Sequence, residues 1–542
     1  MSSSRTFVRG ALILTVAAMV SKLLGSVYTI VLQNLIGDRG MGLYQMAYPV
    51  YATLLVISTA GFPVAISKYV SEYTAIHDLH NAHRIFRAAL LLLTALGLVA
   101  MIAMYVLSGS FAVLAGDSRA ALSLQAVAPA LLIVPILSSV RGYFQGWQWM
   151  RPTAVSQVTE QLVRVVTIMA GVWLVLSLGG RERAAAAIAS FGAVTGGIAG
   201  LAVILYQLRR FRSRLRHEGA VHGRLAKRYK PLPWRVILRK LIYYSIPVSL
   251  GALIIPLFSN VDAFTVTNLL KAQGVSQNTA THLYGLLSGR AFKLLMLPAT
   301  LVSSIGIALL PAVSDAYARS GEKTVAERIR LGMRYTLLLA MPAAVGLTML
   351  ARPIDVALFR DGQGVEAIMW MGAAVLFSSI QINSAASLQG LGSVYTPLVS
   401  LIVGTVLKVA LNLLLVPRFQ IAGAAAATAM SYAFAGGWNW FALKRVVRLR
   451  VSLFRHGMRS ALAVLVMGAF VFAAERQWER LQIAVPVRLN AAGEVAVGVL
   501  VGVFAYALML LISGLLTERE VVTLPKIGVP LVRVLRKIHF YS

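Results

Sequence analysis

Residues 88–108 read AALLLLTALGLVAMIAMYVLS, an uncharged run long enough to cross a hydrocarbon core of about 30 Å as one helix. Similar runs recur along the chain on both sides of it, and apolar segments of this length predict membrane spans. We therefore predict an all-α polytopic membrane protein with about fourteen transmembrane helices; two short runs, 333–351 and 457–474, leave twelve or thirteen open. The expected ranges are 8–36, 42–70, 88–108, 120–146, 153–178, 184–206, 241–270, 282–313, 333–351, 365–391, 396–417, 421–443, 457–474 and 492–516.

The composition also indicates lipid as the solvent. Of the 542 residues, 58% are apolar and 13% charged, whereas soluble domains average about 45–50% and about 25%. The first run carries Lys22 in its middle and lacks a cleavage pattern for a signal peptide, so we expect it to be retained. The absence of cysteine excludes disulfides, thiolate metal sites and cysteine nucleophiles.

The basic residues are unevenly distributed between alternate loops. The net charge is +32, and most loop Lys and Arg fall in the segments that are cytosolic if both termini are cytosolic, as the positive-inside rule predicts. The largest cluster, Arg209 to Lys240, contains one acid, Glu218. Its expected roles are to anchor topology and to contact anionic lipid headgroups. Nucleic acid is not an expected partner, because no fold or motif presents bases.

Short matches at a nearly constant offset indicate an internal repeat. Gln145-Gly146 recurs as Gln389-Gly390, and Val70-Ser71-Glu72 recurs as Val313-Ser314-Asp315. Transporters often place a substrate site between such repeats. The predicted organisation is two six-helix bundles followed by two further helices. Its parts are a lobe at 1–206, a basic cytosolic linker at 207–240, a second lobe at 241–446, and 447–542 with helices thirteen and fourteen and a basic cytosolic tail.

Several basic residues lie inside the apolar runs, where, away from the run ends, Glu160 and Asp262 are the acids that oppose them. A charge at the bilayer centre costs about 2.5–3.5 kcal/mol on insertion scales, so such residues usually face a cavity or a partner. A cavity holding several cations suits a phosphate or pyrophosphate group, because charge-assisted hydrogen bonds are strong. The predicted substrate-binding residues of a central cavity are Lys22, Arg290, Lys293, Arg164 and Lys408.

Structural roles for these charges remain open alternatives. Arg141 is near the cytosolic end of its run and can extend its guanidinium to the interface. Glu160 and Arg164 are four residues apart and can pair on one helix. The other cations can be satisfied by carbonyl groups and by acids distant in sequence.

Proline and glycine interrupt spans two, seven and eight. Proline removes a helix hydrogen bond, and transporters tolerate this where the freed backbone groups face a cavity. A static packing kink is the alternative. The predicted hinge residues are Pro49, Gly61, Pro63, Pro256 and Pro298.

The sequence lacks the motifs that would indicate ATP binding, acid–base catalysis or a metal site. No G-x-x-x-x-G-K-[ST] loop is present to hold ATP phosphates, so any pumping is expected to be secondary. The spans carry no paired carboxylates, and the evenly spaced His77, His80 and His83 fit a solvated face better than a metal site. We predict no catalytic residue, no metal site and no cofactor, and therefore a protein that is not an enzyme.

Three short motifs resemble a known family. They are Ser21-Lys22-Leu23-Leu24-Gly25 in span one, Gly42-Leu43-Tyr44-Gln45 opening span two, and Leu309-Leu310-Pro311 closing span eight. In order and spacing they resemble the polysaccharide-exporter branch of the multidrug/oligosaccharidyl-lipid/polysaccharide (MOP) flippase superfamily. Within that branch, the chain is similar to the stage V sporulation protein B group and to Gram-positive lipid II flippases.

The resemblance implies a two-lobed, V-shaped bundle with a central cationic cavity that opens alternately to each side. It implies lipid II, an undecaprenyl-pyrophosphate disaccharide-pentapeptide, as cargo. Lys22 and Lys293 match positions where lipid II flippases carry cavity arginines. Tyr28 and Met296 depart from the pattern, since the flippases have an arginine and an acid there.

The resemblance also implies an ion site between spans seven, eleven and twelve. Asp262 and Asn412 resemble sodium ligands of the group, but Lys408 stands one turn before Asn412, where a neutral ligand is expected. We therefore assign Asp262 and Asn412 to ion coupling or gating, and we hypothesise that Asp262 pairs with Lys408. Coupling would then use membrane potential or protons instead of sodium.

The sequence favours a flippase for an anionic polyprenyl-pyrophosphate-linked saccharide in the bacterial cytoplasmic membrane, serving peptidoglycan or polysaccharide synthesis or sporulation. One alternative is a cation-coupled exporter of drugs or small amphiphiles. The other is a non-transporting membrane scaffold for cell-envelope synthesis enzymes, which are also possible partners of a flippase. The same fold hosts different functions, so the fold alone does not decide between them.

Overall fold

The computed structural model describes residues 2–222, 230–319, 321–447, 453–481 and 485–515. The described residues are helical and contain no strand, as the sequence predicts. Contacts divide the chain into two compact units, residues 1–290 with 401–424, and residues 291–400 with 425–542. This division describes the packing of one conformation. The predicted lobes, 1–206 and 241–446, stay a prediction.

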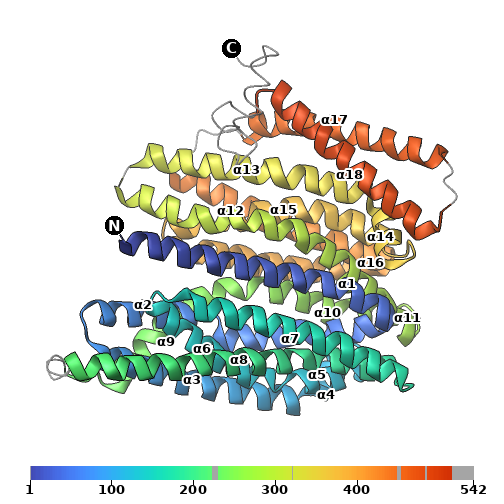
Figure 1. The fold of residues 1–542 in the computed structure, drawn as a ribbon. Helices are drawn as coiled ribbons and strands as arrows, with labels where there is room; N and C mark the ends of the chain where they lie inside the picture. The colour runs from blue at the N-terminus through green and yellow to red at the C-terminus, as the bar shows by residue number, and fades with distance from the viewer. Residues whose placement is uncertain (1, 223–229, 320, 448–452, 482–484, 516–542) are drawn as a thin grey trace. The chain divides into compact units, whose positions relative to one another are not determined.

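The first unit contains the helices drawn from blue to green in Figure 1. Helices α7 and α8 pack against each other, as do α3 and α6. Its elements are α1 (Ser2–Thr59), α2 (Phe62–Ala75), α3 (Leu79–Val106), α4 (Ser108–Leu114), η1 (Ser118–Ala120), α5 (Ala121–Val127), α6 (Ala130–Gly146), α7 (Met150–Ser177), α8 (Glu182–His222), α9 (Trp234–Ala252), α10 (Ile254–Ala272), α11 (Gln277–Gly285) and the π-helical turn η3 (Leu286–Ala291).

The second unit is built around α15, which packs against α12 and α13. Helices α17 and α18, the predicted helices thirteen and fourteen, pack together, and α17 also packs on α13. The Tyr506 hydroxyl of α18 donates to the Leu338 carbonyl of α13 (2.9 Å). Its elements are α12 (Phe292–Arg319), α13 (Glu322–Met349), α14 (Ala351–Phe359), α15 (Val365–Gly390), α16 (Tyr395–Val447), α17 (Leu453–Arg480) and α18 (Val487–Ile512); the middle of α16 belongs to the first unit.

Two helices run through backbone breaks. The chain leaves helical geometry at Gly37 in α1 (φ 70°) and at Gln420 in α16 (φ 49°). These breaks fall between predicted spans one and two and between spans eleven and twelve. Eleven helices of the described residues are long and apolar enough to cross a membrane. The fold class is therefore confirmed, while the count of fourteen stays a prediction.

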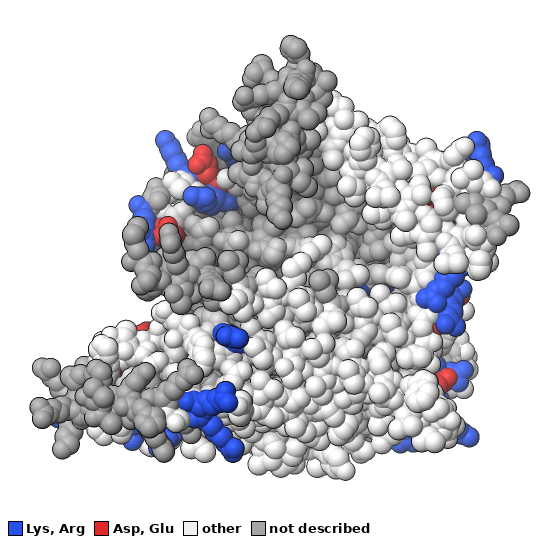
Figure 2. All heavy atoms as spheres, in the orientation of Figure 1, with Lys and Arg blue, Asp and Glu red and all other residues white. Residues whose placement is uncertain are grey.

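Large apolar side chains are exposed on the outside of the helices. Val106 is 71% exposed and Phe504 72% exposed, which would be costly in water and is expected in lipid. On the face that Figure 2 shows, the described charged side chains gather near the helix ends and leave wide uncharged areas between them. Both features are those of a membrane-spanning protein.

One close helix contact occurs in each half of the predicted repeat. A Cβ atom on Gly146 would lie 2.7 Å from Val70 Cβ, and one on Gly390 would lie 3.0 Å from Val313 Cβ. Gly146 and Gly390, and likewise Val70 and Val313, are the positions that match in the sequence. In each half, a glycine at the matching position lets two helices pack closely, which supports the internal repeat.

Candidate functional site: buried charges of the first unit

An ion pair between α10 and α16 lies wholly inside the first unit. Lys408 is fully buried, and its Nζ lies 2.7 Å from Asp262 Oδ2 and donates to the Phe258 carbonyl (2.8 Å). Asn412 Nδ2 donates to the other oxygen, Asp262 Oδ1 (3.0 Å), and to Thr265 Oγ1 (2.8 Å). Both carboxylate oxygens are hydrogen-bonded, as a buried charge requires.

This geometry contains the contact that the sequence-based hypothesis specified. The Lys408 ammonium stands beside the carboxylate where a bound cation would otherwise compensate the charge. It also means that Lys408, predicted as a cavity cation, points its charge into the protein in this conformation. The parts of Asp262 and Asn412 in coupling stay a prediction.

A second buried pair joins the break in α1 to the π-helical turn η3. Arg290 is 2% exposed; its Nε lies 2.8 Å from Asp38 Oδ1, and one terminal nitrogen lies 2.5 Å from Asp38 Oδ2. Gln33 Nε2 donates to the same carboxylate (2.6 Å). A two-pronged Arg–carboxylate contact is strong and directional. In this conformation Arg290 therefore holds α1 to η3, and its predicted contact with substrate stays a prediction.

Asp38 is the residue that sequence reasoning missed here. It follows the Gly37 break and lies in the short gap between two apolar runs, so a search confined to the runs did not include it. Gly285 allows the approach, because a Cβ there would lie 1.9 Å from the Asp38 carbonyl oxygen. The signal that could have found it is the tetrapeptide Gly37-Asp38-Arg39-Gly40, an acid beside a predicted turn.

One carboxylate serves two guanidinium groups between α6 and α7. Glu160 accepts from Arg141 (2.9 Å) and from Arg164 (2.9 Å), and Arg141 also donates to Ser156 Oγ (2.9 Å). The i, i+4 pair expected from the sequence is present, and Arg141 turns to Glu160 instead of to the interface. These side chains are 14–21% exposed. The cluster keeps one excess positive charge.

Arg164 also lines a small cavity with aromatic walls. The cavity has a volume of about 20 Å³ and is lined by Tyr44, Tyr48 and Tyr51 as well. Tyr44 and Tyr28 hydroxyls lie 3.3 Å apart beside it. Arg164 is thus the predicted cavity cation that the described first unit places against an open space.

One predicted cation is only partly described, and another lies in the second unit. Lys22 lies in α1, but its side chain is outside the described residues. Lys293 lies in α12 of the second unit and is partly buried. Convergence of Lys22, Arg164 and Lys293 on one cavity stays a prediction.

Three of the five predicted hinges lie at interruptions in two spans, whereas α1 continues through Pro49. Helix α1 ends at Thr59 and α2 begins at Phe62, with Gly61 and Pro63 at the junction. Helices α9 and α10 are separated at Leu253, just before Pro256. In the second unit, α12 continues through Pro298 without a break. Hinge motion itself stays a prediction.

Two uncharged side chains bond to the backbone around Pro49. A proline has no N–H for the carbonyl four residues earlier; that carbonyl, on Gln45, accepts from the Tyr284 hydroxyl (3.2 Å). Asn260 Nδ2 donates to Thr53 Oγ1 (2.6 Å), to the Pro256 carbonyl (2.9 Å) and, at 3.3 Å, to the Pro49 carbonyl. Sequence reasoning missed Asn260 and Tyr284, because neither carries a charge.

Comparison with known proteins decides the family. A family model described as polysaccharide biosynthesis protein matches residues 7–317. The chain belongs to this family. The lipid II flippase MurJ of Bacillus subtilis (strain 168) is 31% identical to this family member over 458 residues, 82% of this chain and 83% of the relative. Stage V sporulation protein B of the same organism is 28% identical over 535 residues, 98% of this chain and all of the relative.

Solved structures give the same fold. A lipid II flippase MurJ in an inward closed conformation matches with a TM-score of 0.66 and 13% identity, over 92% of this chain and 99% of that chain. An inward-facing multidrug resistance MATE transporter of the MOP superfamily matches with a TM-score of 0.64 and 16% identity, over 82% and 100%. At these identities the likeness shows the fold alone. Together with the sequence relatives and the eleven apolar helices, it shows a multi-pass membrane protein of the polysaccharide biosynthesis family with the fold that these flippase and transporter structures share.

Proposed function

We propose that the protein flips an anionic polyprenyl-pyrophosphate-linked saccharide, lipid II or a related cell-envelope precursor, across the cytoplasmic membrane by alternating access. The observation that carries the proposal is the 31% identity to a lipid II flippase along most of both chains. The excess positive charge inside the spans supports it, because a pyrophosphate compensates cations that a neutral or cationic amphiphile would leave unpaired.

We assign two roles in this cycle, substrate binding and stabilisation of a conformation, to the predicted site residues. Arg164, with Lys22 and Lys293, binds the pyrophosphate, while the polyprenyl tail stays in lipid. Arg290 with Asp38, and Lys408 with Asp262, act as internal ion pairs that hold helices in one conformation. Because the Lys408 ammonium compensates Asp262, the cycle draws on membrane potential or protons instead of sodium. No resident cofactor takes part in this mechanism.

The setting of the protein follows from its charge distribution. Both termini lie in the cytosol, as do the basic linker and tail, where they contact anionic lipid headgroups. Enzymes that make the lipid-linked precursor or polymerise it are candidate partners, because they supply and consume the cargo at the two membrane faces.

The proposal is tested by comparing a variant that lacks two cations inside the spans with a variant that lacks one exposed cation. Purified protein in proteoliposomes is assayed for flipping of fluorescent lipid II, and Lys22→Ala/Lys293→Ala is expected to reduce flipping while leaving the protein folded. The control is Arg319→Ala, since Arg319 is 78% exposed and pairs with Asp315 on its own helix. Equal flipping by all three proteins contradicts the cationic site. A folded double variant that keeps its envelope phenotype in cells without flipping favours the scaffold.

A further inference from the structure

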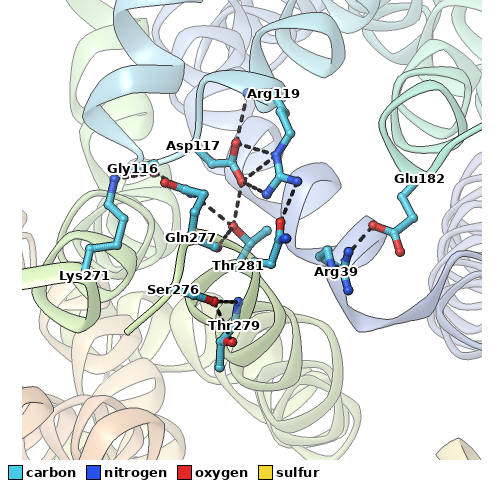
Figure 3. Close-up of polar contacts among 11 residues, drawn as sticks. Arg39, Gly116, Asp117, Arg119, Glu182, Lys271, Ser276, Gln277, Thr279 and Thr281 are labelled. Atoms are coloured by element: carbon cyan, nitrogen blue, oxygen red, sulfur yellow. Dashed lines mark hydrogen bonds and ion pairs between the residues drawn. The ribbon is translucent and has the colours of Figure 1, made fainter. Parts of the chain in front are cut away.

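The loop after α4 is bonded to α10 and α11 through a compact polar network, which Figure 3 shows. The loop belongs to the first predicted lobe, and α10 and α11 belong to the second; both lie in the first compact unit. Predicted topology places the loop and the α10–α11 connection on the outer side of the membrane. We call the contacts between these two segments the outer latch.

Backbone carbonyl groups of the loop accept three side-chain donors. The Gly116 carbonyl accepts from Lys271 Nζ (2.7 Å) and from Gln277 Nε2 (2.8 Å). The Leu114 carbonyl accepts from Asn268 Nδ2 (2.7 Å). These carbonyls lie at and just after the C-terminal end of α4, where carbonyl groups lack partners within the helix. The second segment therefore completes the helix end of the first.

A buried carboxylate forms the centre of the latch. Asp117 is 2% exposed and is held by Arg119, two residues on, with its Oδ2 2.6 Å from a terminal nitrogen of Arg119. Thr281 Oγ1 donates to the same Oδ2 (2.6 Å), and Arg119 donates to Asn278 Oδ1 (2.8 Å). The Asp117–Arg119 pair is local to the loop, whereas Thr281 and Asn278 come from α11. The loop thus presents a preformed charge pair that α11 recognises with neutral groups.

Gly116 lies against side chains of α10. Its φ of +85° favours glycine, and a Cβ there would lie 3.0 Å from Thr267 Cβ and from Asn268 Oδ1. A side chain at position 116 would crowd Thr267 and Asn268 and strain the backbone, so glycine suits this contact. The partners across it are hydrogen-bond donors and acceptors near the outer surface, which water can replace when the segments separate.

We propose that the outer latch closes the external side of the transporter in this conformation and has to open for cargo to leave outward. The inference rests on the proposed alternating access, in which the two predicted lobes move against each other. The bonds join the loop after α4, in the first predicted lobe, to α10 and α11 in the second. All of them are polar contacts, which water can replace when the segments separate. A switch between two bonded states needs contacts of this kind.

Another ion pair in the same view supplies a matched control. Arg39 and Glu182 lie 3.7 Å apart and are 43% and 41% exposed. They join α1 to α8 inside the first predicted lobe, near the same membrane face. A covalent link there should move with the lobe and leave transport intact.

Reversible crosslinking tests the latch, because the natural chain has no cysteine. Arg119→Cys/Asn278→Cys and the control Arg39→Cys/Glu182→Cys are each joined by a short bifunctional methanethiosulfonate in proteoliposomes. The latch link is expected to lower flipping by about tenfold or more, with recovery on reduction, while the control link leaves it within about twofold. Unchanged flipping with a complete latch link overturns the proposal.

Distance measurement separates failure of the latch from failure of the proposed function. Spin labels on the exposed residues Leu114 and Gln273, as Leu114→Cys/Gln273→Cys, leave all the bonding side chains of the latch in place. The latch predicts a short and a long distance population in nanodiscs, and Asp117→Asn is expected to enrich the long one. A single short population in both proteins overturns the latch whether or not any lipid is flipped.

Discussion

The Lys408 ammonium lies 2.7 Å from the Asp262 carboxylate, and both residues are buried among the spans of the first unit. In a medium of low dielectric, each of these charges is stable only because the other is present. The pair therefore links α10 to α16. The Lys408 ammonium compensates the Asp262 carboxylate, as a bound cation would otherwise do.

Removing one member of this pair should cost more than removing both. Lys408→Met or Asp262→Asn alone is expected to lower the free energy of unfolding by about 3–5 kcal/mol, because an uncompensated charge remains buried. The double variant is expected to lose less than either single one. Thermal unfolding in detergent measures all four proteins, and strictly additive losses would show that the two side chains are not coupled.

Sodium should have no effect on the wild-type protein. Flipping is expected to be equal in sodium and potassium media, whereas Lys408→Asn leaves the oxygens of Asp262, Asn412 and Thr265 without a cation and is expected to gain sodium-dependent stability. Paired thermal unfolding and flipping assays in the two salts check this. Sodium-dependent flipping by wild type that disappears in Asp262→Ala refutes the internal-cation account.

The Arg290–Asp38 contact should require the guanidinium shape. Arg290→Lys keeps the charge but cannot make the two-pronged contact, and a loss of about 1.5–3 kcal/mol in the free energy of unfolding is expected. Arg319→Lys is the control: its pair with Asp315 is exposed, so a change within about 0.5 kcal/mol is expected. Equal changes in both variants would mean that the buried contact needs no particular geometry.

The outer latch should survive moderate acid. Burial tends to raise the pKa of Asp117, but hydrogen bonds from Arg119 and Thr281 outweigh it and hold the pKa below its usual value. A carboxyl with a lowered folded pKa stabilises the folded contact above its ordinary value of about 3.9, and the contribution is lost as pH falls through the lowered value. Spin-label distances between positions 114 and 273 are therefore expected to stay constant from pH 7 to about pH 4.5.

The pH result has its own control. Arg119 and Lys271 are the basic side chains that face the Asp117 region. Asp117→Asn is expected to show the longer distance at every pH. Opening of the wild-type latch between pH 7 and 5 contradicts the assignment of Asp117 as its ionised centre.

The all-helical membrane fold was predictable from the sequence, because a membrane span requires a long apolar run. The breaks at Gly37 and Gln420 fall in the gaps that the runs left. The repeat was also visible: Gly146 and Gly390 match in sequence and make the same close contact in their own units. The pairing of Asp262 with Lys408 was hypothesised from the family resemblance, because Lys408 stands where a neutral sodium ligand is expected.

Contacts that depend on loops and neutral side chains were not predictable. Asp38 and Asp117 lie between apolar runs, where an acid is ordinarily solvated, and only the fold brings Arg290 and Thr281 to them. Asn260 satisfies backbone groups near Pro49, a role that many uncharged residues could fill. The sequence pattern identifies which groups need partners, but which distant residues become those partners depends on how the helices pack.

Flipping of lipid II by the purified wild-type chain tests the central claim most directly. Proteoliposomes receive fluorescent lipid II or a capsule-type polyprenyl-pyrophosphate saccharide, with an imposed membrane potential, and lipid exposed on the opposite leaflet is measured against empty vesicles. The account predicts protein-dependent flipping of at least one of the two lipids. No flipping of either lipid by well-folded protein, together with export of a small cationic amphiphile, would contradict it.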